Sequence, residues 1–459
     1  MNLGVMEGVP MKNVLAVLLF FACTLCFAQG EGDWPYWRGP AVDGMAVGDA
    51  PLHWSDTQNI RWKTEIPGRG SSSPVIWGDR IFVTTAIRIG EPPAPAEQPA
   101  QKPAPKFQFA KPGPQGEHKF DVLCLDRKTG KILWEKTAII ANPHEGFHPT
   151  YGSFASNSPV TDGKHVYAFF GSRGMYCYTL DGALVWKKDF GVKMRMRMAF
   201  GEGLGPVISE DRLILVFDYE GDSFMVMLDK NTGKEIWRVS RDEASSWAAP
   251  LVLTFKGQKQ IVVSATKKVR SYDFNSGKLI WECGGLGANA IPHPVHQDDL
   301  VFVMTGYQNP NLMAIRLGRT GDLTGTDAVV WSQTRGNSYT PSPVLHDNKL
   351  YVISDNGMVS CYNARTGEPY YHQVRLPKPN NFKSSFVGAN GKLYIASEDE
   401  DVFVLKMGEK FEVLATNSLA GMMFIATPAI YGGEIYLRGQ ERTPDNTVTS
   451  TQLFCISDK

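Results

Sequence analysis

The chain has 459 residues, of which 43% are hydrophobic and 20% are charged. Its 47 basic and 47 acidic residues give a formal net charge of zero, so nothing marks the whole surface for nucleic acid or for an acidic membrane. A chain of this length usually holds two or three domains, but a single closed ring of repeats can also use all of it.

Residues 1–28 are predicted to be a signal peptide. Lys12 precedes an apolar run over residues 14–21, which is too short to span a bilayer. Small residues then precede Ala28, and we expect cleavage after it. The mature chain is therefore expected to be exported to the periplasm or cell envelope and to contain no transmembrane segment.

Two alternatives stay open at this end of the chain. Met11 is a candidate initiation site, because the ten residues before it are unusual for a signal peptide. Lipidation at Cys23 or Cys26 is the second alternative, and it fits less well because Leu25 is too large to precede a lipidated cysteine.

A short blade start, usually ending in Pro and an apolar residue, recurs eight times along the chain. The copies are Ser72-Ser73-Pro74-Val75, Asn157-Ser158-Pro159-Val160, Leu204-Gly205-Pro206-Val207, Ala248-Ala249-Pro250-Leu251, Pro292-His293-Pro294-Val295, Pro341-Ser342-Pro343-Val344, Ser384-Ser385-Phe386-Val387 and Ala426-Thr427-Pro428-Ala429. The third residue of each copy is taken as its marker position. Apart from the first interval, successive marker positions lie 42 to 49 residues apart. This period is typical of four-stranded propeller blades.

A Pro-rich segment, residues 89–119, interrupts the first repeat. Its composition cannot form a core, so we expect a disordered, extended insertion within the first blade. A docking site for a Pro-reading partner is the alternative to a tolerated surface loop.

The interior of each repeat supports four antiparallel strands. Gly-, Asp- and Asn-rich turns and β-branched runs follow each blade start, and many third strands end in a pattern such as Asp229-Lys230-Asn231-Thr232-Gly233. Most fourth strands carry a large aromatic residue, which we expect to pack between blades. The tryptophans at this position are Trp134, Trp186, Trp237, Trp281 and Trp331.

The ring is predicted to close through an N-terminal strand. The last repeat has only three strands, and the segment around Trp62 has the character of the missing fourth strand. Closure would remove the open edges of a linear array. The predicted fold is therefore all-β, one eight-bladed β-propeller over residues 29–459. An unrelated N-terminal strand at Trp62 is the alternative.

These residues resemble a known family. The Asp-x-x-Thr-Gly-x-x-x-Trp pattern after a Ser-Pro-Val start is similar to the repeat of the pyrroloquinoline quinone (PQQ)-like propellers, the quinoprotein alcohol dehydrogenase-like superfamily. The opening at residues 33–40 resembles secreted PQQ-like proteins of planctomycete-type bacteria. The resemblance spans residues 33–459 and implies the fold, but it does not specify an activity.

Five cysteines remain after the expected cleavage. Cys124, Cys177, Cys361 and Cys455 occupy the same third-strand position in different repeats. Because equivalent positions on different blades are separated by whole sheets, we expect buried core thiols and no disulfides.

The candidate site lies where the connections between blades meet around the channel. Residues 193–198 alternate cations with methionines, which in an extended chain would give a basic mouth for a carboxylate, a phosphate, an acidic peptide or an anionic glycan. A solvated loop with a packed Met face is the alternative. The predicted ligand-binding residues are Tyr151, Lys193, Arg195, Arg197, Trp247, His293, Tyr339 and Lys383.

The spacing of His144 and His148 invites a metal hypothesis. Gly146 and the flanking prolines argue against the helix that would aim both imidazoles at one ion, so we expect a polar loop and no metal site. His293, between two prolines, is more typical of a loop-bracing residue than of a ligand.

The quinone cofactor implied by the resemblance is not expected here. The chain has no adjacent cysteine pair, no matching calcium-binding set and no haem motif. The leading hypothesis is an exported, non-catalytic, monomeric scaffold that binds a peptide, protein or cell-envelope component. It would be similar in architecture to the propeller lipoprotein that assists outer-membrane protein assembly. A PQQ-dependent oxidoreductase of quinoprotein type is the alternative.

Overall fold

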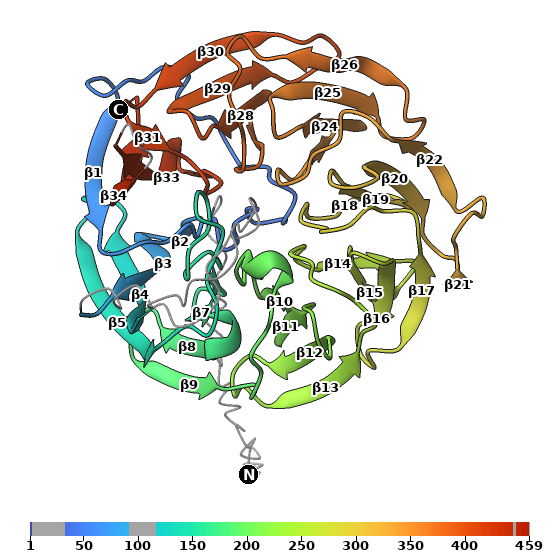
Figure 1. Ribbon diagram of the computed structural model, residues 1–459, viewed down its shortest axis with the longest axis horizontal. Helices are drawn as coiled ribbons and strands as arrows, with labels where there is room; N and C mark the ends of the chain where they lie inside the picture. Colours follow the sequence, from blue (N-terminus) through green and yellow to red (C-terminus); the bar gives the residue numbers. More distant parts are fainter. Residues whose placement is uncertain (2–32, 91–115, 444–446, 459) are drawn as a thin grey trace, which may run out of the picture.

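Eight antiparallel sheets are arranged as blades around a central channel (Figure 1), which confirms the predicted all-β, eight-bladed propeller. The computed structural model describes residues 1, 33–90, 116–443 and 447–458. The predicted signal peptide lies outside the described residues. Most of the predicted Pro-rich insertion does so as well, although its last two residues already belong to strand β4 (His118–Asp126).

The blades are numbered in the order of their starts, and each is built from four strands that run from the channel outward. Blade 1 contains β2 (Val75–Trp77), β3 (Arg80–Arg88), β4 and β5 (Ile132–Ala141); blade 2 contains β6 (Val160–Thr161), β7 (His165–Phe169), β8 (Met175–Thr179) and β9 (Leu184–Lys188); blade 3 contains β10 (Val207–Ser209), β11 (Arg212–Phe217), β12 (Phe224–Asp229) and β13 (Glu235–Ser240); blade 4 contains β14 (Leu251–Phe255), β15 (Gln258–Val263), β16 (Val269–Asp273) and β17 (Leu279–Cys283).

The second half of the ring repeats this order. Blade 5 contains β18 (Val295–Gln297), β19 (Leu300–Thr305), β20 (Asn311–Arg316) and β22 (Val329–Gln333); blade 6 contains β23 (Val344–His346), β24 (Lys349–Ile353), β25 (Met358–Asn363) and β26 (Pro369–Arg375); blade 7 contains β27 (Val387–Ala389), β28 (Lys392–Ala396), β29 (Asp401–Lys406) and β30 (Val413–Ser418); blade 8 contains β32 (Ala429–Tyr431), β33 (Glu434–Arg442), β34 (Val448–Ile456) and β1 (Ile60–Ile66). Short extra elements are β21 (Gly321–Asp322), β31 (Met422–Met423) and the 3-10 helices η1 (Gly171–Arg173) and η2 (Arg197–Ala199).

Burial follows the position of each strand in its blade. The middle strands are almost completely buried, as in β11, because both of their faces pack against neighbouring blades. The outer strands alternate between exposed and half-buried residues, as in β13. Each core cluster joins adjacent blades; for example, Phe82 of blade 1 belongs to the same cluster as Val166 of blade 2.

An N-terminal strand closes the ring, as predicted. β1 pairs antiparallel with β34, and Trp62 lies opposite Cys455. The first ordered strand of the chain thereby supplies the outer edge of blade 8 (Figure 1).

The recurring tryptophans dock each blade onto the next. In the regular case, the indole Nε1 donates a hydrogen bond of 2.9–3.2 Å to a backbone carbonyl of the following blade. The donors are Trp62, Trp134, Trp186, Trp237 and Trp331. The turn glycine of the following blade lies on the indole face. At Gly233, which has a φ of 69°, an added Cβ would come within 2.7 Å of Trp186. These indoles therefore serve interblade packing.

Trp281 departs from this predicted equivalence. Its Nε1 contacts Gln260 Oε1 within its own blade at 3.3 Å, and its side chain is only 1% exposed. In blade 5 no glycine of the turn after β20 packs on an indole, and residues 317–328 instead form an excursion that places β21 beside β17. The excursion covers Trp281, so no docking turn is needed there.

The segment before β1 crosses the channel, which the sequence did not predict. Trp34 pairs with Ile76 of blade 1, and Tyr36 Oη donates to Pro206 O of blade 3. The guanidinium of Arg38 donates to Phe386 O of blade 7 and also to a carbonyl of blade 6. The crossing segment, residues 33–50, lies near the middle of the ring in Figure 1 and contacts blades 1, 3, 6 and 7.

The five cysteines of the described residues are buried and unpaired, as expected. Cys124, Cys177 and Cys455 each lie opposite a docking tryptophan on the adjacent strand. Burial raises the pKa of the Cys124 thiol to about 12, so the thiol stays neutral. Within the described ranges, no helix has the length and apolar character needed to cross a bilayer.

Candidate functional site

A pocket of about 460 Å³ opens at the centre of the ring, where the connections between blades meet. Every blade contributes to its wall, through Ser73, Ser158, Gly205, Ala249, Ile291, Ser342, Ser385 and Thr427 in chain order. Trp37 of the crossing segment also lines the pocket. The pocket is therefore a concave chamber rather than an open channel, and such chambers are the usual place for a ligand.

Aromatic side chains form much of the wall. Phe200, Trp247, Tyr307 and Tyr339 line it together with Trp37. Trp247 Nε1 donates to Gly201 O at 2.8 Å, and Tyr339 Oη accepts from Asn289 at 3.2 Å. Because these bonds fix the ring orientations, the pocket presents preorganised apolar faces to a ligand.

The charged group at the pocket edge is already neutralised. Lys383 Nζ lies 3.4 Å from Asp355 and 3.4 Å from Glu398, and 4.8 Å from the ring centroid of Tyr151. Burial alone would lower the pKa of Lys383, but the two carboxylates raise it above its usual value. Burial raises the pKa values of Asp355 and Glu398. The amine of Lys383 is therefore paired with Asp355 and Glu398 and is not available as a free cation for an anionic ligand.

His148 completes this edge. Its ring stacks on Tyr151 with a centroid distance of 3.8 Å. Burial, followed by the nearby charge of Lys383, lowers the pKa of His148 to about 4. The imidazole is thus neutral at neutral pH and acts as an aromatic surface.

Half of the predicted ligand-binding residues meet at this pocket. Tyr151, Trp247, Tyr339 and Lys383 line it. Lys193, Arg195 and Arg197 are not part of its lining, and His293 is buried behind it with 1% exposure. The structure therefore brings together the predicted aromatic residues and Lys383, but not Lys193, Arg195 and Arg197.

The predicted alternation of exposed cations and buried methionines holds only for residues 193–196. Met194 and Met196 are buried, while Lys193 and Arg195 are exposed. The pattern ends at η2, where Met198 has a φ of 54° and its side chain is 47% exposed. As a result, Met198 lines the pocket, whereas Arg195 reaches outward to Glu220 O at 3.3 Å.

His293 braces the connection into blade 5. Its Nδ1 donates to Ala249 O at 3.1 Å, and its backbone N–H donates to Ser342 Oγ at 2.9 Å. Burial, with a smaller contribution from Arg38, lowers the pKa of His293 to about 3. The side chain is a neutral structural group, in agreement with the bracing role.

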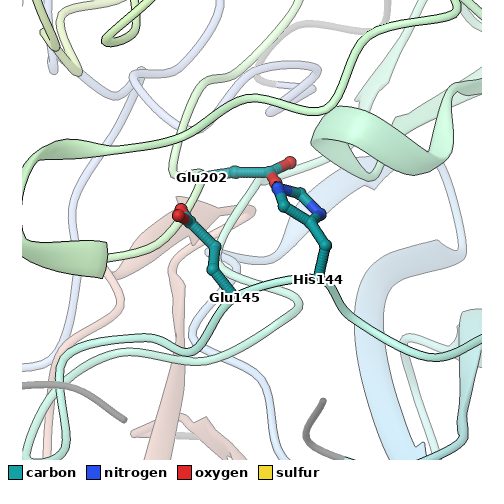
Figure 2. Close-up of side chains that lie close together, drawn as sticks. All are labelled: His144, Glu145 and Glu202. Carbon is teal, nitrogen blue, oxygen red and sulfur yellow. The ribbon is translucent and has the colours of Figure 1, made fainter. Parts of the chain in front are cut away.

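His144, Glu145 and Glu202 form a cluster (Figure 2) that is not part of the pocket lining. One nitrogen or oxygen atom from each side chain lies within 4.8 Å of the others. His144 Nε2 bonds to Met194 O at 2.7 Å, and Glu145 accepts from the Met196 N–H at 3.0 Å. Glu202 is paired with Arg173 at 3.1 Å. These groups bind the 193–198 segment and each other, so the cluster serves as a brace.

The two histidines of the predicted loop do not converge. His144 faces Glu202 at 3.7 Å, whereas His148 stacks on Tyr151 at the pocket. Burial, aided by the charge of Glu202, raises the pKa of Glu145 to about 7.

The second residue of each blade start, here called a ring position, also lies at the centre of the ring, and sequence reasoning named only His293 among these residues. They are Ser73, Ser158, Gly205, Ala249, His293, Ser342, Ser385 and Thr427, and all except His293 line the pocket. A comparison of these residues between the eight repeats would have revealed that most carry a hydroxyl and three do not.

Several solved structures are similar to this fold. BamB from Moraxella catarrhalis is 13% identical with a TM-score of 0.50, and the match covers 81% of this chain and 98% of that one. The quinohemoprotein alcohol dehydrogenase of Comamonas testosteroni is 9% identical with a TM-score of 0.61, with coverage of 92% and 80%. A europium-containing methanol dehydrogenase is 10% identical with a TM-score of 0.61, with coverage of 93% and 98%. At these identities the likeness concerns the fold.

Sequence comparisons add a distant relative and a family. The tetrathionate hydrolase of Acidithiobacillus ferrooxidans is 21% identical over 354 residues, which cover 68% of this chain and just under two thirds, 66%, of that protein. The family profile described as outer membrane protein assembly factor BamB matches residues 118–373 and 316–452. Because these matches cover well over half of the chain, the protein belongs to this PQQ-like propeller family.

Proposed function

We propose that this protein is an exported, non-catalytic scaffold that binds a peptide or protein segment of the cell envelope in its central pocket. The observation that carries the proposal is the aromatic chamber of about 460 Å³, to which all eight blades contribute and which Trp37 helps to close. A fixed, largely apolar chamber of this kind favours capture of a side chain or chain end.

The electrostatics of the lining support binding rather than reaction. Among the described residues that line the pocket, Lys383 carries the only full positive charge at neutral pH, and it is held by Asp355 and Glu398. None of the lining residues is acidic. The family profile, named for an assembly factor, is consistent with a role in binding other proteins.

The quinone alternative fits these residues poorly. PQQ is a planar quinone that carries carboxylates, and buried carboxylates require compensating cations or many donors. Arg195 and Arg197, which would supply that charge, do not line the pocket. Cys124 and its equivalents lie between blades rather than at the channel. Among the described lining residues, Lys383 is the only cation and it already pairs with Asp355 and Glu398, so several buried carboxylates would lack compensating charge.

Capture from envelope extract, with matched variants, tests the proposal. Immobilised protein comprising residues 33–459 should retain a defined protein or peptide, and Trp247→Ala should lose it because the variant removes one aromatic wall. Ile236→Ala is the control, since Ile236 is 41% exposed on the outer strand β13, away from the pocket. Equal capture by wild type and Trp247→Ala would contradict binding at the pocket.

A further inference from the structure

A circle of hydrogen bonds links the ring positions from blade to blade. At each regular link, the backbone N–H of one ring position donates to the side-chain hydroxyl of the next. These links measure 2.9–3.0 Å, and they run from His293 to Ser342, Ser385, Thr427, Ser73 and Ser158. In each of these links, the N–H of a ring position points toward the side-chain hydroxyl of the ring position on the following blade.

The circle is interrupted over blades 3 to 5. Gly205 and Ala249 carry no hydroxyl, and His293 directs its imidazole to Ala249 O instead. The backbone N–H groups of Ser158, Gly205 and Ala249 consequently have no acceptor among the residues that the structure describes. All three residues line the pocket. A polar group that is left without a partner in a buried site carries a free-energy penalty that a ligand acceptor can remove.

The space in front of the Ser158 N–H is open. A Cβ added at Gly205 would meet no atom within 4 Å, so the position that a serine hydroxyl would fill is vacant. Asn157, which is 4% exposed and lines the same part of the pocket, has no hydrogen-bond partner for its Oδ1 among the described residues. Trp247, Phe200 and Met198 provide apolar surface nearby.

We infer that the N–H groups of Ser158, Gly205 and Ala249 form a receptor for a carboxylate on an apolar ligand. Backbone N–H groups from neighbouring blades of a concave wall are suited to an oxyanion, because N–H bonds to charged acceptors are stronger than N–H bonds to neutral ones. Among the residues that the structure describes, no acidic side chain lines the pocket to repel it. The inference rests on the proposed binding function and names its ligand class: a peptide with a free, apolar C-terminal residue, or a small organic acid with the same chemistry.

The test uses probes that differ only in the carboxylate. The probes are a short peptide that ends in a free phenylalanine, the same peptide amidated, and 3-phenylpropanoate, each titrated into the full chain with tryptophan fluorescence or calorimetry as readout. The free acid is expected to bind about tenfold or more tightly than the amide. Tighter binding of the peptide than of 3-phenylpropanoate assigns the site to a chain terminus, and equal binding assigns it to a small acid.

Two variants refill the vacant hydroxyl positions. In Gly205→Ser the new hydroxyl should accept a hydrogen bond from the Ser158 N–H, and in Ala249→Ser it should accept one from the Gly205 N–H. Each variant should therefore bind the free-acid peptide about tenfold less tightly and have a higher thermal midpoint. The backbone at Gly205 has no positive φ to strain a serine. Gly203→Ser is the matched control, because it adds the same side chain in the pocket wall with only Trp247 in reach, at 3.4 Å.

The outcomes separate this inference from the proposed function. If acid and amide bind equally and both serine variants bind like wild type, while Trp247→Ala still loses binding, the carboxylate receptor is wrong and the pocket function stands. If none of the probes binds, the receptor is wrong; retention of an envelope protein that depends on Trp247 then decides the proposed function separately.

Discussion

Trp62, on the first strand of the propeller, lies directly opposite Cys455, on the last strand of the chain. The indole of Trp62 also donates to Arg127 O of blade 1 at 2.9 Å. Trp62 therefore joins blade 8 to blade 1, and β1, the strand that carries it, is here called the seam strand because it closes the ring.

Removal of the seam strand should destabilise the whole ring. A chain that begins at residue 67 lacks β1 and the crossing segment and exposes the edge of β34. We expect its thermal midpoint to fall by at least about 5 °C relative to a chain that begins at residue 33. Circular dichroism melts of the two proteins provide the measurement, and equal midpoints would contradict closure as a source of stability.

Truncation of a docking tryptophan should cost stability without affecting the pocket. Trp237 donates to Phe274 O of the next blade at 3.2 Å and packs on the turn at Gly277. Trp237→Ala should lower the free energy of unfolding by about 3 kcal/mol, whereas Trp237→Phe should cost about 1 kcal/mol. Denaturant titration measures both values. A loss of ligand binding by folded Trp237→Phe would contradict a purely structural role.

The periodic part of the fold could be predicted from sequence because each repeat contains its own turns, strands and docking residue. The predicted closure at Trp62 followed from counting strands in one repeat. The path of residues 33–50 was not predictable in this way, because this segment is not part of the repeat. Tyr36 and Arg38 donate hydrogen bonds to carbonyls that lie 170 and 348 residues away in the sequence. The exception at Trp281 depends on an excursion in the next blade, which local patterns do not specify.

Glu145 should make stability depend on pH. In the folded state burial raises its pKa to about 7, while the unfolded chain releases the proton near the ordinary value of 4.5. The folded state therefore holds the extra proton between these values, and stability falls as pH rises from 4.5 to 7.

Glu145→Gln isolates this contribution. The glutamine can still accept the Met196 N–H but carries no charge, so the variant should be about 2 kcal/mol more stable than wild type at pH 8 and nearly equal to it at pH 5. Urea unfolding at both pH values measures the difference. Glu145→Ala, which loses the acceptor, is the control, and a pH-independent difference for Glu145→Gln would contradict the assignment.

Arg38 should act as a structural tie across the channel. It is fully buried, and burial lowers its pKa to about 10, so it remains charged at neutral pH. Arg38→Met leaves carbonyls such as Phe386 O without a donor and should cost about 2–4 kcal/mol. Arg195→Met, at an exposed position, should change stability by less than about 0.5 kcal/mol. Similar stabilities for the two variants would show that the tie contributes nothing.

Only half of the predicted ligand-binding residues line the pocket, because the sequence pattern indicates which connections reach the channel but not the local path of each connection. Tyr151, Trp247, Tyr339 and Lys383 were found because the fold places every connection before a blade start at the channel. Arg195 was misleading because an alternating pattern implies an extended chain, whereas η2 ends the extension and turns Met198 inward instead. The interrupted hydroxyl circle was visible in the sequence, but its meaning depends on hydrogen bonds between separate blades.

The crossing segment and β1 also set an order of events during synthesis. They leave the ribosome before the strands of blades 1 to 7, yet β34, the partner of β1, emerges tens of seconds later at about 5–20 residues per second. Until then blade 8 has no outer strand and the channel has only part of its floor contacts. The nascent propeller must therefore remain an open arc, and the binding chamber comes into existence only when the last strand arrives.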